Sequence, residues 1–324
     1  MSGKVQKKAQ TIKERRRGAC THLRCRTEDV YSLTRPFQKP ANRVHTVRAY
    51  AKINLGLLVL EKRPDGYHDI ETVFHTIALH DVVTIEPCDR IVVECSDRTV
   101  PTDRTNLAFR AALLLQRHCP GRKGVRITIH KEIPTGAGLG GGSADAAAVL
   151  RTLPGIWECH VDDQTMHETA LRIGSDVPFF LRGGTAVGKG RGEMLEYFDL
   201  TVPHTILVCN PGIHVSTPDA YHMIRPHRRH CDFRTILAEG MSDPRTLNGQ
   251  LVNDFEGPVF AVHPALRDLK ESMLTGGAAF ALMSGSGSSV YGLFDDEPRA
   301  RATADSCAAR GYSTFLTPPG FMPA

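Results

Sequence analysis

The sequence lacks several features that would assign it to common classes of protein. It contains no run of about 18 uncharged apolar residues, which excludes a transmembrane helix. The lysines near its start, Lys4, Lys7 and Lys8, are not followed by an apolar stretch, so we expect no secretory signal. Its nine cysteines are an odd number without a Cys-x-x-Cys pair, which argues against a disulfide framework and favours a reducing cytosol. We therefore expect a cytoplasmic protein that does not bind membranes.

The 324 residues are enough for one large domain or two ordinary ones. The net charge of +5 is unevenly distributed. Residues 1–48 hold 13 Lys and Arg against 3 Asp and Glu, a net charge of +10, whereas residues 49–324 hold 27 against 32, a net charge of −5. We interpret residues 1–48 as a basic, disordered extension, or as the product of a start site assigned too far upstream. Binding of nucleic-acid phosphates by this extension is the less favoured alternative.

Regular hydrophobic patterns begin at Val47. They predict strands over 47–60, 80–87, 90–95, 125–130, 205–209, 279–283, 289–294 and 312–316. They predict helices over 107–115 and 143–153, a helix starting at Pro264, and one that starts at Pro298 and ends before Gly311. Strands and helices mix without strict strand–helix–strand alternation, which indicates the α+β class. A break near Pro203 suggests two domains, 49–202 and 203–324.

A glycine-rich loop precedes the helix predicted at 143–153. Five glycines in the seven positions 136–142 let the backbone turn sharply and present successive N–H groups. We expect Ser143 to cap the helix, whose unpaired first N–H groups and positive dipole end favour a phosphate. The loop therefore predicts phosphate binding, with a plain turn as the alternative.

Two common phosphate-binding patterns do not describe this loop. No lysine follows the glycines, so the P-loop pattern is absent. Gly136, Gly138 and Gly141 satisfy the dinucleotide pattern G-x-G-x-x-G, but the preceding strand carries polar side chains on one face. Because the first strand of a dinucleotide-binding domain is buried on both faces, we disfavour a dehydrogenase and expect an antiparallel or mixed sheet.

Three segments resemble the motifs of the GHMP kinases, the superfamily of galactokinase, homoserine kinase and mevalonate kinase. They are Ala51–Leu55, Pro134–Ala147 and Ser284–Ser289. Two more segments, 62–68 and 174–180, resemble the branch of this family that phosphorylates 4-diphosphocytidyl-2-C-methyl-D-erythritol in the non-mevalonate isoprenoid pathway. The resemblance spans about residues 47–320 and leaves the basic extension outside.

The resemblance implies a two-domain fold and a reaction. The N-terminal domain would resemble domain 2 of ribosomal protein S5, and the C-terminal domain would be ferredoxin-like. The implied reaction is ATP-dependent phosphorylation of the substrate's 2-hydroxyl. The alternative is another GHMP kinase, acting on homoserine or on a mevalonate derivative. The oligomeric state, monomer or homodimer, is left open.

The resemblance also implies the residues of the site. Asp176 would act as the base at the acceptor hydroxyl, beside Lys52, a lysine in an otherwise apolar strand. A helix cap is the alternative role for Asp176, and a lysine reaching solvent from a strand end is the alternative for Lys52. The residues implied to bind ATP are Pro134, Thr135, Gly136, Ala137, Gly138, Leu139, Gly140, Gly141, Gly142, Ser143 and Ala144. The residues implied to bind the substrate are Asn54, Tyr67, His68, Thr217 and Tyr221. Mg²⁺ is expected to accompany ATP, with unknown protein ligands and Ser143 as one possibility.

Overall fold

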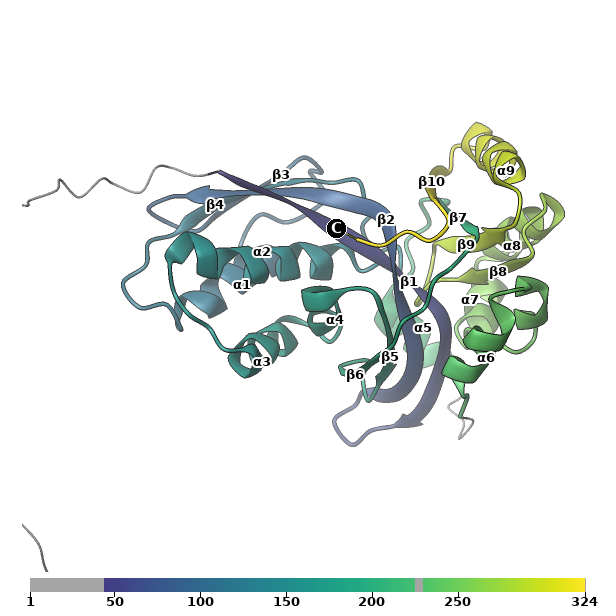
Figure 1. Ribbon diagram of the computed structural model, residues 1–324, viewed down its shortest axis with the longest axis horizontal. Coiled ribbons are helices and arrows are strands. Elements are labelled where there is room, and N and C mark those ends of the chain that lie inside the picture. The colour runs from purple at the N-terminus through teal and green to yellow at the C-terminus, as the bar shows by residue number, and fades with distance from the viewer. Residues whose placement is uncertain (1–43, 225–229, 324) are drawn as a thin grey trace, which may run out of the picture. The chain divides into compact units, whose positions relative to one another are not determined.

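The computed structural model describes residues 44–224 and 230–323, which contain two β-sheets (Figure 1). The predicted basic extension therefore lies outside the described residues up to position 43. Residues 45–48 were predicted to belong to the disordered extension. They instead form the start of the first strand, which begins at His45. The mixture of helices with two sheets confirms the α+β class predicted from the sequence.

The larger sheet has six strands in the order β3-β4-β2-β5-β6, with β1 also paired to β2. Their bounds are β1 His45–Lys62, β2 His68–Pro87, β3 Val92–Cys95, β4 Val125–His130, β5 Thr185–Lys189 and β6 Met194–Tyr197. β2 is antiparallel to β1, β4 and β5, whereas β3 and β4 are parallel. The sheet is thus mixed, as the half-polar strand before the glycine loop predicted.

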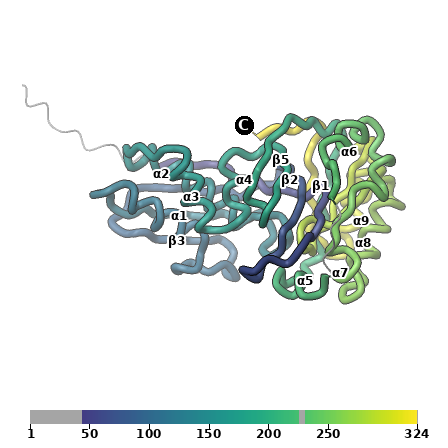
Figure 2. Tube along the Cα trace, turned by 90° about the horizontal axis from the view of Figure 1, so that it is seen from below, coloured from purple at the N-terminus to yellow at the C-terminus, as the bar shows by residue number. Residues whose placement is uncertain are grey.

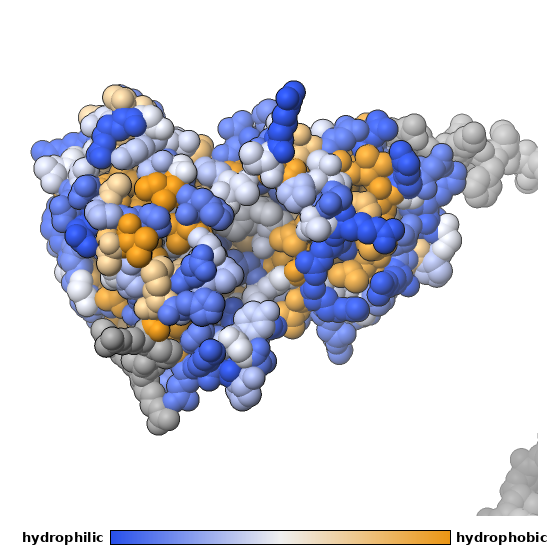
Figure 3. Space-filling view, turned by 180° about the vertical axis from the view of Figure 1, so that it is seen from behind, coloured by the Kyte–Doolittle hydropathy of each residue, from blue (hydrophilic) through white to orange (hydrophobic). Residues whose placement is uncertain are grey.

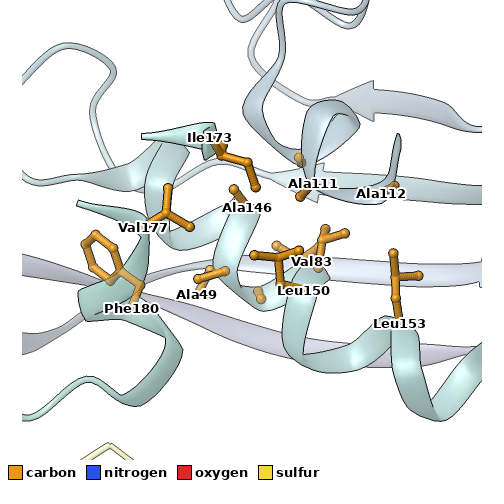
Figure 4. Close-up of a cluster of buried hydrophobic side chains, with 14 of the residues drawn as sticks. Ala49, Val83, Ala111, Ala112, Ala146, Leu150, Leu153, Ile173, Val177 and Phe180 are labelled. Carbon is orange, nitrogen blue, oxygen red and sulfur yellow. The ribbon is translucent and has the colours of Figure 1, made fainter. Parts of the chain in front are cut away.

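Four helices accompany this sheet: α1 Leu107–Gln116, α2 Gly141–Trp157, α3 Asp163–Ile173 and α4 Val177–Arg182. α2 is the central one. Its side chains Ala146 and Leu150 lie between the strands on one side and α1 on the other (Figure 4). The small alanines of this helix let it pack closely against its neighbours, so that its N-terminal end is held firmly against the sheet.

The second sheet has four strands in the order β10-β7-β9-β8. Their bounds are β7 Thr205–Asn210, β8 Phe280–Met283, β9 Val290–Phe294 and β10 Ser313–Thr317. The accompanying helices are α5 Thr217–Met223, α6 Phe233–Gly240, the 3₁₀ helix Pro244–Leu247, α7 Glu256–Val262, α8 Pro264–Thr275 and α9 Glu297–Ala309.

The long strands β1 and β2 run between these two groups of elements. α1–α3 lie toward one end of the described body and α5–α9 toward the other (Figure 2). Seen from behind, the surface is hollowed between the two groups (Figure 3). Side chains from β1 therefore reach elements of both groups, which is the basis of the site described below.

The largest differences in length between predicted and observed elements concern β2 and α2. β2 is 20 residues long, whereas only 80–87 was predicted as a strand. Residues 70–77 are all buried in the structure. Their polar and apolar residues do not alternate in the sequence, so the pattern that reveals a half-buried strand is absent. α2 begins at Gly141 and not at Ser143, because glycine residues form its first turn.

One disulfide was not foreseen from the sequence. Cys119, after α1, and Cys159, after α2, are bonded with their Cα atoms 5.8 Å apart. The partners are 40 residues apart and belong to no spacing motif, so the pairing was not apparent from the sequence. None of the helices in the described part of the chain has the length and apolar character needed to span a bilayer.

Candidate active site

A pocket of about 560 Å³ brings together the three segments that resemble GHMP motifs. It is lined by Lys52 and Asn54 of β1, by the glycine-rich loop, and by Gly285 and Ser286 of the β8–β9 loop. Asp176 and two residues of α5, Thr217 and Tyr221, also line it. Its volume lies within the range of pockets that hold small molecules, about 300–1,000 Å³.

The glycine-rich loop adopts a conformation that only glycine accepts readily. Gly136, Gly138 and Gly140 have φ angles of 67°, 77° and 73°. Gly140 occupies the cap position of α2, and no side chain caps the helix. The expectation that Ser143 caps it is therefore wrong, since Ser143 lies within the first turn. Among the described residues, no side chain accepts from the first N–H groups of α2, which leaves the helix end suited to an anion.

Lys52 and Asp176 meet at this pocket from positions 124 residues apart. The Lys52 Nζ lies 3.8 Å from the Asp176 Oδ2, and the two side chains are 5% and 35% exposed. Lys52 is therefore not a strand-end lysine that reaches into solvent. Its backbone N–H also donates to the Leu139 carbonyl at 3.1 Å, which fixes β1 against the glycine-rich loop.

A short hydrogen-bond chain orients the Lys52 ammonium. Lys52 Nζ donates to Asn54 Oδ1 at 2.6 Å, and Asn54 Nδ2 donates to the Thr72 hydroxyl at 2.8 Å. That hydroxyl in turn donates to the Gly56 carbonyl at 2.6 Å. Burial lowers the pKa of Lys52, and the charge of Asp176 opposes this shift. The site therefore holds a desolvated cation next to a carboxylate that solvent still reaches.

Asp176 stands at the cap position of α4 but does not cap it. Its side chain makes no capping hydrogen bond to the helix, so the alternative role considered from the sequence finds no support. Burial, and to a smaller extent the charge of Asp176, raise the pKa of Tyr221 to about 12. Tyr221 and Asp176 both line the pocket.

The β8–β9 loop is tied directly to the glycine-rich loop. The Ser284 hydroxyl accepts from the Asn54 backbone N–H at 3.2 Å and donates to the Gly138 carbonyl at 3.0 Å. The Ser289 N–H donates to the Ala137 carbonyl at 3.2 Å. The third motif-like segment thus holds the glycine-rich loop in its conformation.

The residues predicted to bind substrate are only partly gathered at the pocket. Asn54, Thr217 and Tyr221 line it, and the Thr217 hydroxyl lies 3.0 Å from that of Ser286. The His68 ring stacks on Tyr221, with ring centroids 5.2 Å apart and an interplanar angle of 13°. Tyr67 does not line the pocket; it is 56% exposed.

Most of the predicted ATP-binding residues line the pocket, and two do not. The Leu139 side chain is buried in the core between the sheet and the second group of elements. The Ala144 side chain faces away from the pocket, on the other side of α2. Ala144 lies in the first turn of α2, where successive side chains point in different directions around the helix axis.

Several residues at the pocket were missed by the sequence analysis. Lys131 Nζ contacts the carboxylates of Asp81 and Asp145, the latter at 3.1 Å. Asp81 Oδ1 accepts from the N–H groups of Glu132 and Ile133 at 2.7 and 2.8 Å, which anchors the entry to the glycine-rich loop. In the sequence, Asp145 lies in the segment Pro134–Ala147, whereas Asp81 and Lys131 belong to no motif.

Two further groups of residues line the pocket. Val100, Pro101, Thr105, Asn106 and Leu107 form the wall before and at the start of α1. Arg191 lines the pocket, and its guanidinium lies 5.0 Å from the centre of the Tyr67 ring. Tyr67 therefore contacts the rim of the site through Arg191.

Comparison with known proteins agrees with this geometry. Residues 106–184 match the GHMP kinases N terminal domain, and residues 237–313 match the GHMP kinases C terminal domain. A 4-diphosphocytidyl-2-C-methyl-D-erythritol kinase from Chlorobium phaeobacteroides is 42% identical over 280 residues, which cover 85% of this chain and 95% of the relative. One of the same name from Chlorobium luteolum is 43% identical over 283 residues, which cover 85% and 97%.

Solved structures give the same result. The crystal structure of a 4-(cytidine 5'-diphospho)-2C-methyl-D-erythritol kinase superposes with a TM-score of 0.74 at 36% identity, and covers 86% of this chain and 100% of its own. A homoserine kinase from Cytophaga hutchinsonii superposes with a TM-score of 0.65 at 19% identity, over 87% and 96% of the two chains, which shows a shared fold alone. The chain therefore belongs to the GHMP kinases and, within them, to the 4-diphosphocytidyl-2-C-methyl-D-erythritol kinase family.

Proposed function

We propose that this protein transfers the γ-phosphate of ATP to the 2-hydroxyl of 4-diphosphocytidyl-2-C-methyl-D-erythritol, in the non-mevalonate isoprenoid pathway. The observation that carries the proposal is the Lys52–Asp176 pair, 3.8 Å apart, in the same pocket as the open N-terminal end of α2. Phosphoryl transfer requires mainly positioning and charge stabilisation, and these groups supply both.

The proposed position of ATP follows from the shape of the pocket. The triphosphate would bind the N–H groups of the glycine-rich loop and the first turn of α2. The nucleoside would lie along the wall formed by Pro101, Asn106 and Leu107, which offers apolar contacts and one amide for hydrogen bonding. Lys131 is held at this wall by Asp81 and Asp145, so its position is fixed before nucleotide binds.

The proposed role of Asp176 is to orient the acceptor hydroxyl and to receive its proton. The carboxylate is partly exposed and makes no capping bond, so it is free to accept a hydrogen bond from the substrate. The proposed role of Lys52 is to stabilise the negative charge that develops on the acceptor oxygen. Asn54 keeps the ammonium in place through its 2.6 Å hydrogen bond.

The aromatic side chains support a cytidine-linked substrate. In the proposal, the pyrimidine ring stacks beside the His68–Tyr221 pair, and the Thr217 hydroxyl contacts the substrate. Tyr67 acts at the rim, where it positions Arg191. The Arg191 guanidinium would then pair with the diphosphate of the substrate.

Mg²⁺ fits the residues present in the pocket. Asp145 lines it, is buried, and has one carboxylate oxygen, Oδ1, with no hydrogen-bond partner among the described residues. Mg²⁺ bound with nucleotide phosphates typically uses only one or two carboxylates from the protein. We propose that Asp145 and the Ser143 hydroxyl hold the ion, which would neutralise charge on the ATP phosphates.

The proposal includes the domain division predicted from the sequence, with an N-terminal ATP-binding domain over 49–202 and a C-terminal domain over 203–324. In its support, the strands of the larger sheet all precede residue 198 and those of the smaller sheet all follow residue 204. It also includes action in the cytoplasm, as a monomer or homodimer, on a small-molecule substrate and without nucleic acid.

Steady-state turnover of ATP with three acceptors tests the proposal. The full-length protein is assayed with 4-diphosphocytidyl-2-C-methyl-D-erythritol, homoserine and phosphomevalonate under the same conditions. We expect turnover with the cytidyl substrate alone. Faster turnover of homoserine or phosphomevalonate would overturn the proposed substrate and favour another GHMP kinase activity.

A further inference from the structure

A second cavity, of about 630 Å³, lies on the other side of α2 from the active site. We call it the arginine pocket. It is lined by Val47, Arg48, Ala49 and Tyr50 of β1, Thr76 of β2, Ala144, Arg151 and Thr152 of α2, Phe180 and Arg182 of α4, Gly183 and Pro323. It shares none of these residues with the pocket that holds Lys52 and Asp176.

Positive charge gathers around this cavity without compensation. Arg48, Arg151 and Arg182 come from three different elements and line one pocket. Within residues 44–224 and 230–323, no aspartate or glutamate forms an ion pair with any of them. The Arg182 guanidinium packs over the Tyr197 ring, 4.3 Å from the ring centre. Three arginines in one concavity create a positive potential that attracts an anion.

Thr76 and Thr152 add hydroxyl groups to the lining, and most of its remaining residues are apolar. Tyr50 lies against Phe321, with ring centroids 5.5 Å apart, so the C-terminal residues pack beside β1 at this place (Figure 1). Phe180 and Pro323 add further apolar surface. The cavity therefore offers guanidinium groups and a hydrophobic wall to the same ligand, and its volume matches that of pockets for small molecules.

We propose that the arginine pocket is a second ligand site, which binds a small organic phosphate with an apolar or aromatic group. Guanidinium groups donate paired hydrogen bonds that match phosphate oxygens, so several of them favour a phosphate over a singly charged carboxylate. The apolar wall distinguishes an organic phosphate from the inorganic ion. This inference does not depend on the proposed kinase reaction.

The arginine pocket also contacts residues that pack against the glycine-rich loop. A Cβ atom built on Gly140 would lie 2.6 Å from the Phe180 ring, so this ring packs directly against the cap of α2. Ala144, whose N–H donates to the Gly140 carbonyl at 2.9 Å, lines the arginine pocket from the first turn of the same helix. A ligand in the arginine pocket therefore contacts residues that hold the phosphate-binding loop in place.

Calorimetric titration of the full-length protein tests the proposal. The active site is first saturated with Mg²⁺ and a non-hydrolysable ATP analogue, and the protein is then titrated with phenyl phosphate, inorganic phosphate and phenol separately. We expect one phenyl phosphate per chain, bound about tenfold or more tightly than either inorganic phosphate or phenol, because only phenyl phosphate uses both parts of the lining. Absence of saturable phenyl phosphate binding would overturn the proposal.

Two double variants distinguish ligand binding at a specific site from non-specific attraction by surface charge. Arg48→Gln/Arg151→Gln removes two guanidinium groups of the pocket, and Arg90→Gln/Arg117→Gln removes the same charge from exposed positions outside both pockets. We expect the first variant to lose phenyl phosphate affinity by about tenfold or more and the second to keep it. Both should retain wild-type turnover without phenyl phosphate, which verifies folding. Equal losses in the two variants, or no loss in the first, would refute the site.

Discussion

Gly138 gives the sharpest test of how the glycine-rich loop is built. Its φ angle is 77°, and a Cβ atom placed on it would lie closer than 3.0 Å to the carbonyl oxygen of Ser284 and 3.2 Å from that of Gly287. Real Cβ atoms essentially never approach backbone that closely. Alanine at this position must therefore push the glycine-rich loop and the β8–β9 loop apart.

Gly121 provides a matched control, because it has the same φ angle of 77° but nothing within 4 Å of its Cβ position. Alanine in the left-handed region costs about 1–2 kcal/mol, so Gly121→Ala should lower the free energy of unfolding by that amount. Gly138→Ala should lower the free energy of unfolding by the same amount and by about 1–3 kcal/mol more, since its Cβ overlaps the neighbouring loop. The difference between the variants isolates the contact from the backbone strain.

Urea denaturation and steady-state kinetics measure both consequences. Gly121→Ala should keep the wild-type KM for ATP, whereas Gly138→Ala should raise it about tenfold or more, because the displaced N–H groups no longer meet the phosphates. If Gly138→Ala were no less stable than Gly121→Ala, and bound ATP equally well, the contact between the two loops would have no role in holding the phosphate site.

Three further predictions concern pH, substrate recognition and the basic extension. Burial lowers the pKa of His75 from 6.5, its ordinary value, to about 4 in the folded chain. Between these two pH values the unfolded chain binds a proton that the folded chain does not. The free energy of unfolding should therefore fall by up to about 1.4 kcal/mol for each unit that the pH drops below about 6.5, and urea denaturation of His75→Gln should show a smaller slope; an unchanged slope would contradict the assignment. Tyr221→Leu removes the ring that stacks on His68 and should raise the KM for the cytidyl substrate about tenfold, whereas Tyr221→Phe should not; equal kinetics of the two variants would exclude stacking as the mode of recognition. Removal of residues 1–43 should leave turnover intact and abolish any salt-sensitive binding of nucleic acid, and a loss of turnover would show that the extension contributes to the site.

Much of the site could be predicted from the sequence because its main segments carry local signals. The glycine-rich loop is recognisable from its composition, and the position of Lys52 within an apolar strand marks it as unusual. The polar face of the strand before the loop correctly excluded a dinucleotide-binding sheet, and that strand does pair antiparallel with β2. These inferences need only the neighbours of each residue along the chain.

The parts that escaped prediction depend on contacts between distant residues. Lys131 is bound by Asp81 and Asp145, which lie 50 and 14 residues away; Asp145 lies in the segment Pro134–Ala147, but nothing in that segment indicates that it pairs with Lys131. The stacking of His68 on Tyr221 joins the start of β2 to α5. The arginine pocket likewise collects one arginine from each of three elements. The hydrophobic periodicity of a single segment does not indicate which distant residues it will contact.

Asp176→Asn is the most direct test of catalysis by the Lys52–Asp176 pair. Asparagine keeps the size of the side chain but removes its charge and its ability to accept a proton. With ATP and 4-diphosphocytidyl-2-C-methyl-D-erythritol, kcat should fall about 10²–10⁴-fold while the KM for ATP stays near its wild-type value. A variant that keeps near-normal kcat would show that Asp176 does not act on the acceptor hydroxyl.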